Sequence, residues 1–125
     1  MKMQSLVDPA LNTLTGYGAG YVEVNRVRHA GPVLVSPQGE VQTWALADWS
    51  ALAPADFEAM LALRPEVVLL GTGSRQRFAH PRLHACLSAA RIGLECMDTG
   101  AACRTYNILM AEGRRVLAAL IPPAA

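Results

Sequence analysis

The sequence predicts an α/β fold, a three-layer sandwich with a mainly parallel central sheet and an N-terminal β excursion. Its 125 residues are the length of one ordinary domain. Hydrophobic residues make up 52% of the chain and charged residues 17%, a balance that excludes a disordered protein. From residue 54 onward, helical patterns alternate with short aliphatic runs, as they do in proteins with parallel strands and right-handed crossovers.

The first 20 residues are expected to form an irregular N-terminal segment, and residues 21–123 a single α/β domain. Gly16, Gly18 and Gly20 follow one another closely in the first segment and interrupt any regular pattern there. Three β-rich runs then predict an antiparallel meander, at residues 21–27, 32–36 and 41–45.

The remaining residues predict three helices that alternate with three strands. We expect helices at residues 54–63, 81–90 and 99–112, and strands at 67–70, 94–97 and 116–121. Asp98 can cap the third helix at its start, and Gly113 can end it. The first two strands should be parallel neighbours, so that the loops after them open at the same edge of the sheet.

The loop that follows the first of these strands is a candidate anion site. Gly71, Thr72 and Gly73 let the backbone approach a ligand closely, and Arg75 and Arg77 supply guanidinium groups that suit an oxyanion. The loop lacks the lysine of a Walker A motif and the third glycine of a dinucleotide-binding fingerprint. A plain glycine turn with two solvated arginines explains the same residues.

A second group of polar residues lies at and beyond the start of the third helix. Asp98 and Thr99 supply a carboxylate and a hydroxyl, and Thr105, Tyr106 and Asn107 follow one to two turns later. We treat all five as candidate ligand-binding residues. The simpler alternatives are helix capping by Asp98, a buried Tyr106 with a satisfied hydroxyl, and an Asn107 bonded to a neighbouring loop.

The cysteines and histidines predict no catalytic residue, no metal site and no cofactor. Cys86, Cys96 and Cys103 are expected to be small core thiols without chemistry. Cys103 lies near a predicted helix start, where the helix dipole would lower the pKa of its thiol, but no histidine base accompanies it. His80 and His84 have the spacing of two ligands on one helix face, yet the glutamate of a zinc-binding helix motif is missing.

Charge and targeting signals exclude several classes of protein. The net charge of +1 favours no nucleic-acid partner, although residues 63–125 carry eight arginines against four carboxylates. The longest aliphatic run, residues 116–121, is too short for a transmembrane segment. An odd number of cysteines and the lack of a secretory signal predict a cytoplasmic bacterial protein.

Several spaced motifs resemble one known family. They are VVLLGTG at residues 67–73, GLECMDT at 93–99, TYNIL at 105–109, EGR at 112–114 and AALIP at 118–122. In this order they resemble the small α/β family of unknown molecular function that includes mitochondrial respiratory complex I assembly factor 3 and the adipogenesis-associated domain protein. The resemblance implies a three-layer α/β fold with a β excursion from the N-terminal half. It also implies that the family's pocket corresponds to Gly71, Thr72, Gly73, Asp98, Thr99, Thr105, Tyr106 and Asn107.

Two classes of function follow from these observations. We expect a non-enzymatic binding or assembly-factor-like protein that offers an apolar, arginine-edged surface to a protein partner, because no nucleophile–base pair, metal set or cofactor motif is complete. The alternative is a binding protein or enzyme for a small anion or small molecule. It would use the loop edge at residues 71–77 and 98–107.

Overall fold

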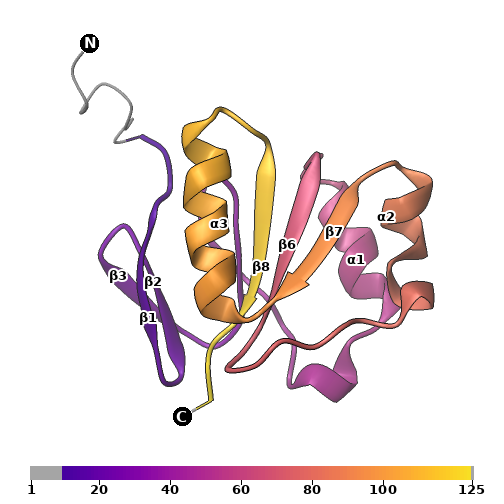
Figure 1. Ribbon diagram of the computed structural model, residues 1–125, viewed down its shortest axis with the longest axis horizontal. Helices are drawn as coiled ribbons and strands as arrows, with labels where there is room; N and C mark the ends of the chain where they lie inside the picture. Colours follow the sequence, from indigo (N-terminus) through magenta and orange to yellow (C-terminus); the bar gives the residue numbers. More distant parts are fainter. Residues whose placement is uncertain (1–9, 125) are drawn as a thin grey trace.

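The computed structural model describes residues 10–124, which form two β-sheets and three α-helices (Figure 1). The N-terminal sheet consists of β1 (Leu14–Gly18), β2 (Tyr21–Val24) and β3 (Val27–Ala30), paired antiparallel in that order. The central sheet has the strand order β5-β4-β8-β6-β7. Its strands are β4 (Val33–Val35), β5 (Gln42–Thr43), β6 (Val67–Thr72), β7 (Gly93–Met97) and β8 (Val116–Ile121).

Strand β1 contradicts the irregular structure expected over residues 1–20; residues 1–9 lie outside the described part of the chain. Two of the glycines that suggested a break, Gly16 and Gly18, instead make room for side chains of the next strand, whereas Gly20 lies in the turn after β1 with a φ of 81°. Gly18 pairs with Tyr21, and a Cβ on Gly18 would lie 2.7 Å from the Tyr21 ring. Glycine therefore permits the close cross-strand contact here.

The prediction of a single strand over residues 21–27 is wrong, because the chain reverses direction within this range: β2 ends at Val24 and β3 begins at Val27. Asn25 and Arg26 both have positive φ angles, 52° and 68°, and they join β2 to β3. Two consecutive residues of this kind form the tight turn whose twist suits a β-hairpin.

The central sheet confirms the predicted parallel pair but not a mainly parallel sheet. β6 is parallel to both β7 and β8, whereas β4 is antiparallel to both β8 and β5, so the sheet is mixed. The meander expected from the N-terminal half is thus divided between two sheets. All three residues of β4 are buried, because a strand inside the central sheet is covered on both faces.

The helices begin and end close to the expected positions. They are α1 (Pro54–Leu61), α2 (Ala85–Ala89) and α3 (Thr99–Ala111), with 3₁₀ turns η2 (Trp49–Ala51) and η3 (Pro81–His84). The predicted helix at 81–90 is therefore a 3₁₀ turn followed by a short α-helix, because the His80 side chain accepts a bond from the Arg82 N–H and closes a tight turn at Pro81. Asp98 caps α3 as predicted, accepting from the Ala101 N–H at 2.9 Å. No helix in residues 10–124 is long and apolar enough to cross a bilayer.

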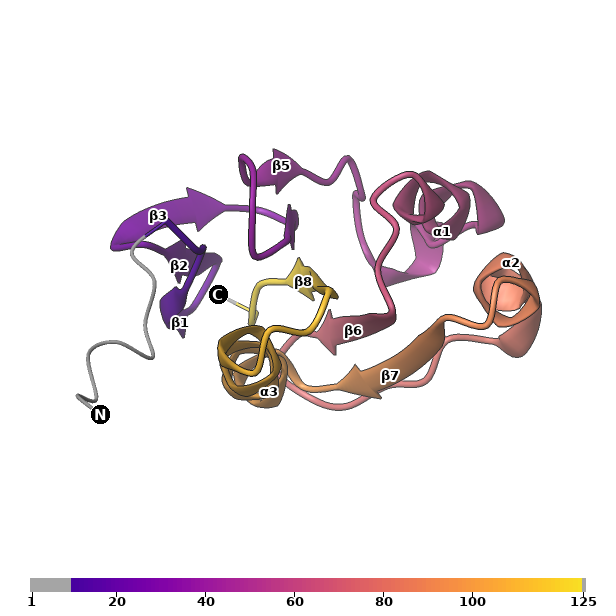
Figure 2. The same ribbon diagram turned by 90° about the horizontal axis from the view of Figure 1, so that it is seen from above.

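Both faces of the central sheet are buried, and β6 shows why. Val67 and Leu69 pack with α3 and the N-terminal sheet, whereas Val68 and Leu70 pack with α1 and α2 on the other side. Figure 2 shows this layering, with α3 on one side of β8 and β6 and α1 on the other. The carboxyl ends of β6 and β8 lie together at one end of the sheet and their amino ends at the other.

Candidate functional site

Two hollows lie at opposite ends of the central sheet. The loop-edge hollow, of about 640 Å³, lies beyond the carboxyl ends of β6 and β8 and is lined by residues that include Trp49, Arg75 and Arg77. The groove, of about 490 Å³, lies at the amino ends of the same strands and is lined by residues that include Met110 and Arg115. Only the first hollow is at the edge that the sequence indicates.

The two loops expected to meet at this edge do meet. The Thr99 N–H donates to the Gly73 carbonyl at 2.9 Å, and the Gly73 N–H donates to Thr99 Oγ1 at 2.8 Å. The buried Thr99 hydroxyl also donates to the carbonyl of Ile121, at the end of β8. These bonds join the ends of three structural elements, so the Gly73 N–H and the Thr99 hydroxyl are already engaged within the protein.

The other residues of the predicted glycine loop shape the chain. A Cβ on Gly71 would lie 2.8 Å from the Leu120 side chain of β8 and 3.3 Å from the Ala102 Cβ of α3, so glycine allows the close packing of β6 against both elements. The Thr72 hydroxyl lies 2.6 Å from the Arg75 carbonyl and accepts from the Arg77 N–H at 3.1 Å. Thr72 therefore stabilises the loop conformation at Arg75 and Arg77.

Arg77 has an unusual environment. Its Nε atom is buried and has no hydrogen-bond partner among the described residues. Its guanidinium carbon lies 5.7 Å from the centre of the Trp49 ring, and both residues line the loop-edge hollow with Arg75. The sequence analysis did not identify Trp49, and a large aromatic residue between two predicted elements was the available signal for it.

Tyr106 and Asn107 lie away from this edge and hold β1 in place. The buried Tyr106 hydroxyl donates to the Asn12 carbonyl at 2.9 Å, and burial raises the pKa of that hydroxyl. Asn107 accepts from the Leu14 N–H at 2.9 Å and donates to the Leu14 carbonyl at 2.8 Å. Thr105, half-buried on α3, lines neither hollow. The structure thus separates these three residues from the glycine loop, and their role in binding stays a prediction.

The cysteines and histidines do not converge on a site. Burial raises the pKa of the Cys103 thiol to about 11, which outweighs any lowering by the helix dipole or by the nearby Arg104. The His80 ring is engaged in its capping bond, and the His84 ring lies 6.0 Å from that of Phe57, edge to face. Within residues 10–124, no group of three His, Cys, Asp or Glu side chains is placed to hold a metal ion.

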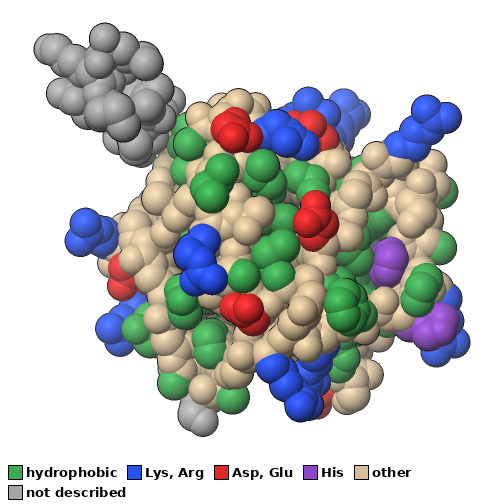
Figure 3. All heavy atoms as spheres, in the orientation of Figure 1, with side chains coloured by type: hydrophobic (Ala, Val, Ile, Leu, Met, Phe, Trp, Pro, Cys, Tyr) green, Lys and Arg blue, Asp and Glu red, His purple; other side chains and the backbone are tan. Residues whose placement is uncertain are grey.

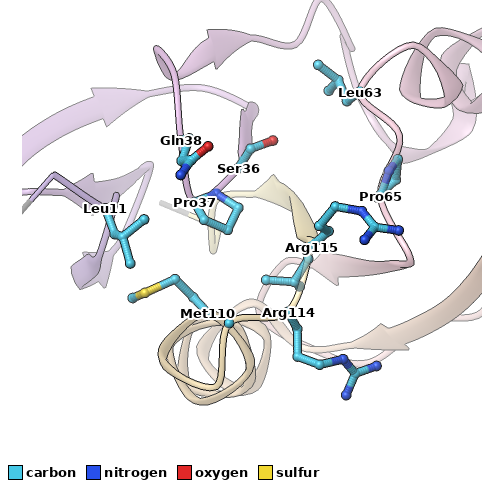
Figure 4. Close-up of a pocket in the computed structure, with 11 residues that line it drawn as sticks. Leu11, Ser36, Pro37, Gln38, Leu63, Pro65, Met110, Arg114 and Arg115 are labelled. Carbon is cyan, nitrogen blue, oxygen red and sulfur yellow. The ribbon is translucent and has the colours of Figure 1, made fainter. Parts of the chain in front are cut away.

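The groove at the opposite end is mainly apolar with a basic rim. Figure 4 shows Leu11 and Met110 directed toward each other, with Pro37 beside Leu11 and above Met110, and the two arginines on the opposite side. The lining residues include two arginines and no carboxylate: Leu11, Ser36, Pro37, Gln38, Leu63, Pro65, Met110, Gly113, Arg114, Arg115 and Val116. They come from segments far apart in the sequence, and the Arg114–Arg115 pair after a helix-ending glycine was the available local signal.

The two arginines of the groove, Arg114 and Arg115, differ in their contacts. Arg114 forms an ion pair with Glu66 at 3.3 Å, and the Glu66 carboxylate also accepts from the Arg115 N–H at 2.8 Å. These contacts, the backbone bond first, hold the pKa of Glu66 below its usual range. The Arg115 side chain donates only through Nε, to the Arg64 carbonyl at 3.3 Å; within the described chain its Nη groups make no hydrogen bond, although its charge also acts on Glu66. Figure 3 shows basic side chains, with acidic ones among them, where α3 ends and β8 begins.

Comparison with known proteins identifies relatives over most of the chain. Residues 14–121 match the family model described as "Protein of unknown function (DUF498/DUF598)". A Bos taurus protein named NADH dehydrogenase (ubiquinone) 1 alpha subcomplex assembly factor 3 is 34% identical over 117 residues, which are 92% of this chain and 63% of the relative. The chain therefore spans less than two thirds of that relative's length.

Two solved structures are similar in both sequence and fold. A crystal structure of a Bordetella parapertussis protein is 47% identical, with a TM-score of 0.86, and the match covers 90% of this chain and 97% of that one. A solution NMR structure from Bordetella pertussis, described as an Mth938-like domain, is 38% identical with a TM-score of 0.84, over 99% and 94% of the two chains. These matches confirm the family resemblance indicated by the sequence motifs.

Proposed function

The chain belongs to the DUF498/DUF598 family of proteins of unknown function, and we propose that it is a non-enzymatic, assembly-factor-like protein that binds another polypeptide in the groove. The observation that carries this proposal is the apolar floor of the groove beside the free end of Arg115. The name of the bovine relative, an assembly factor, supports the same class of function. The three free cysteines suit the reducing, cytoplasmic setting that we infer for the chain.

The groove specifies the chemistry of its occupant. Leu63 is half-buried and offers an apolar contact beside a floor formed by the buried Pro65 and Met110. The Arg115 guanidinium can form a bidentate bond with a carboxylate at the rim, whereas Arg114 is already paired with Glu66. The expected occupant is therefore a polypeptide segment with an apolar side chain next to an aspartate or glutamate.

A peptide selection tests this proposal. Random dodecapeptides displayed on phage are selected on the wild-type protein, and the enriched peptides are synthesised and titrated by fluorescence polarisation. We expect enriched sequences to combine large apolar residues with Asp or Glu. Arg115→Glu should weaken their binding by about tenfold or more, because a carboxylate then meets a carboxylate.

Two further variants separate groove binding from general effects of charge. Leu63→Gln, at the half-buried side of the groove, should also weaken binding because it removes apolar contact. Arg82→Glu makes the same charge change on η3, outside the groove, and should bind like wild type. Failure to enrich any peptide, or equal binding by wild type and Arg115→Glu, would overturn the proposal.

A further inference from the structure

We propose that the loop-edge hollow is a second binding site, for a small tetrahedral oxyanion of the phosphate or phosphate-monoester class, held mainly by Arg77. This site lies at the opposite end of the central sheet from the groove and shares no lining residue with it. It is therefore independent of the proposed polypeptide site and can fail or succeed separately.

The unpartnered Nε of Arg77 is the first observation for this site. A buried donor on a charged group is costly when it has no acceptor, and a bound water or ion is one established explanation of such an atom. A guanidinium group presents its N–H donors as a planar fork that matches the oxygens of phosphate. The Arg77 guanidinium makes no hydrogen bond or ion pair within the described chain, so an oxyanion in the hollow would supply acceptors to the part of the group that lines it.

The second observation is that Arg77 is held in place before any ligand arrives. Its guanidinium lies over the Trp49 ring, and the backbone N–H of Arg77 donates to the Thr72 hydroxyl. The same hydroxyl lies within bonding distance of the Arg75 carbonyl and the Met97 carbonyl of β7. A site that is already ordered loses less entropy on binding than one that must form around its ligand.

The remaining groups in the hollow add donors and limit the size of the ligand. Arg75 contributes a second, exposed guanidinium, and the Ser74 hydroxyl accepts from the Ala124 N–H at 2.8 Å, which leaves its own proton available. Asp48 lines the same hollow, and its carboxylate accepts from the Ser50 hydroxyl. Two cations against one carboxylate favour a small anion, and Asp48 opposes a large polyanion.

Titration followed by two-dimensional ¹H–¹⁵N NMR tests the site. Sodium phosphate is added at constant ionic strength, and the reporters are the amides of residues 74–77 and the Trp49 indole N–H. We expect saturable shifts in these signals that fit one dissociation constant. Arg77→Gln should weaken binding by about tenfold or more, as expected for loss of a charge-assisted fork. Arg82→Gln, an exposed arginine outside the hollow, is the matched control and should leave the affinity unchanged.

Further measurements keep the test decisive. Arg75 is exposed, so Arg75→Gln leaves the fold intact and should still weaken binding about threefold, even if Arg77→Gln disturbs the loop. Glycerol 3-phosphate, titrated in parallel, identifies a monoester ligand if it binds more tightly than inorganic phosphate. Non-saturable shifts, an equal response to acetate, or wild-type affinity in both arginine variants would overturn the proposal.

Discussion

Replacing Asn107 with alanine is expected to destabilise the folded protein by about 1–3 kcal/mol, because the side chain makes two hydrogen bonds of about 0.5–1.5 kcal/mol each. These bonds join α3 to both backbone polar groups of Leu14, at 2.9 Å and 2.8 Å, across 93 positions of sequence. The residue is half-buried, so water replaces the lost partners only in part. For a domain of this size the loss corresponds to a fall in Tm of about 4–12 °C.

Thermal and urea unfolding of Asn107→Ala, followed by circular dichroism, measure this effect. Hydrogen exchange adds local information, because the Leu14 amide should lose protection more than amides of β6 do. Ile108→Ala is the matched control, since Ile108 is the next residue of α3 and its side chain is 60% exposed. A stability of Asn107→Ala equal to that of Ile108→Ala would refute the assignment of Asn107 as the anchor of β1.

Three other perturbations test the loop edge and the core. Thr99→Val should cost about 2–4 kcal/mol in urea unfolding, because it leaves the buried Gly73 N–H and the part-buried Ile121 carbonyl without their partner, while Thr99→Ser should lose far less; equal stability of the two variants would contradict this. Gly71→Ala should lower the free energy of unfolding by about 1–3 kcal/mol, because the added methyl group overlaps the Leu120 side chain. An unchanged free energy in the same assay would contradict this and show that the neighbouring residues move apart without cost. Because burial raises the pKa of Cys103 from 9.0 to about 11, the folded state keeps a proton that the unfolded state loses, so stability should be steady below pH 9 and fall from pH 9 to 11. The fall should be smaller in Cys103→Ala, iodoacetamide should label the folded thiol slowly from pH 6 to 9, and rapid labelling would argue against burial.

The elements that sequence analysis predicted correctly carry their signals locally. β6 begins with an aliphatic run at residues 67–70, β8 is aliphatic throughout, and α3 lies between a capping aspartate, Asp98, and a glycine with a φ of 82°, Gly113. The parallel pairing of β6 with β7 follows from their alternation with helices. For the same reason, the meeting of the two loops at one edge could be predicted.

The elements that were missed depend on partners distant in sequence. The glycines of β1 lie against side chains of β2, Gly16 against Glu23 and Gly18 against Tyr21, and no local pattern indicates those contacts. β4 pairs with β8, a strand far away in the sequence, and both of its faces are buried there. It is therefore part of the central sheet and not of the β2–β3 hairpin that precedes it. Mixed pairing of the central sheet therefore could not be predicted from periodicity.

The candidate sites show the same division. A basic glycine loop could be found from residues 71–77, but the unpartnered Nε of Arg77 depends on how Trp49 packs beside it. The groove is built from residues as distant as Leu11 and Arg115, which tertiary packing brings together. Tyr106 and Asn107 looked like ligand residues because a polar pair on a helix has the same sequence pattern whether it contacts a ligand or another strand.

The most direct test of the proposed function is to map where a selected peptide contacts the protein. A ¹⁵N-labelled sample is titrated with the tightest dodecapeptide from the selection, and amide shifts are followed to saturation. We predict that the largest shifts are those of the amides that line the groove at the amino ends of β6 and β8, which belong to Leu11, Ser36, Gln38, Leu63, Met110 and residues 113–116. Shifts concentrated on the outer face of α3 or at the loop-edge hollow, with the groove unaffected, would contradict it.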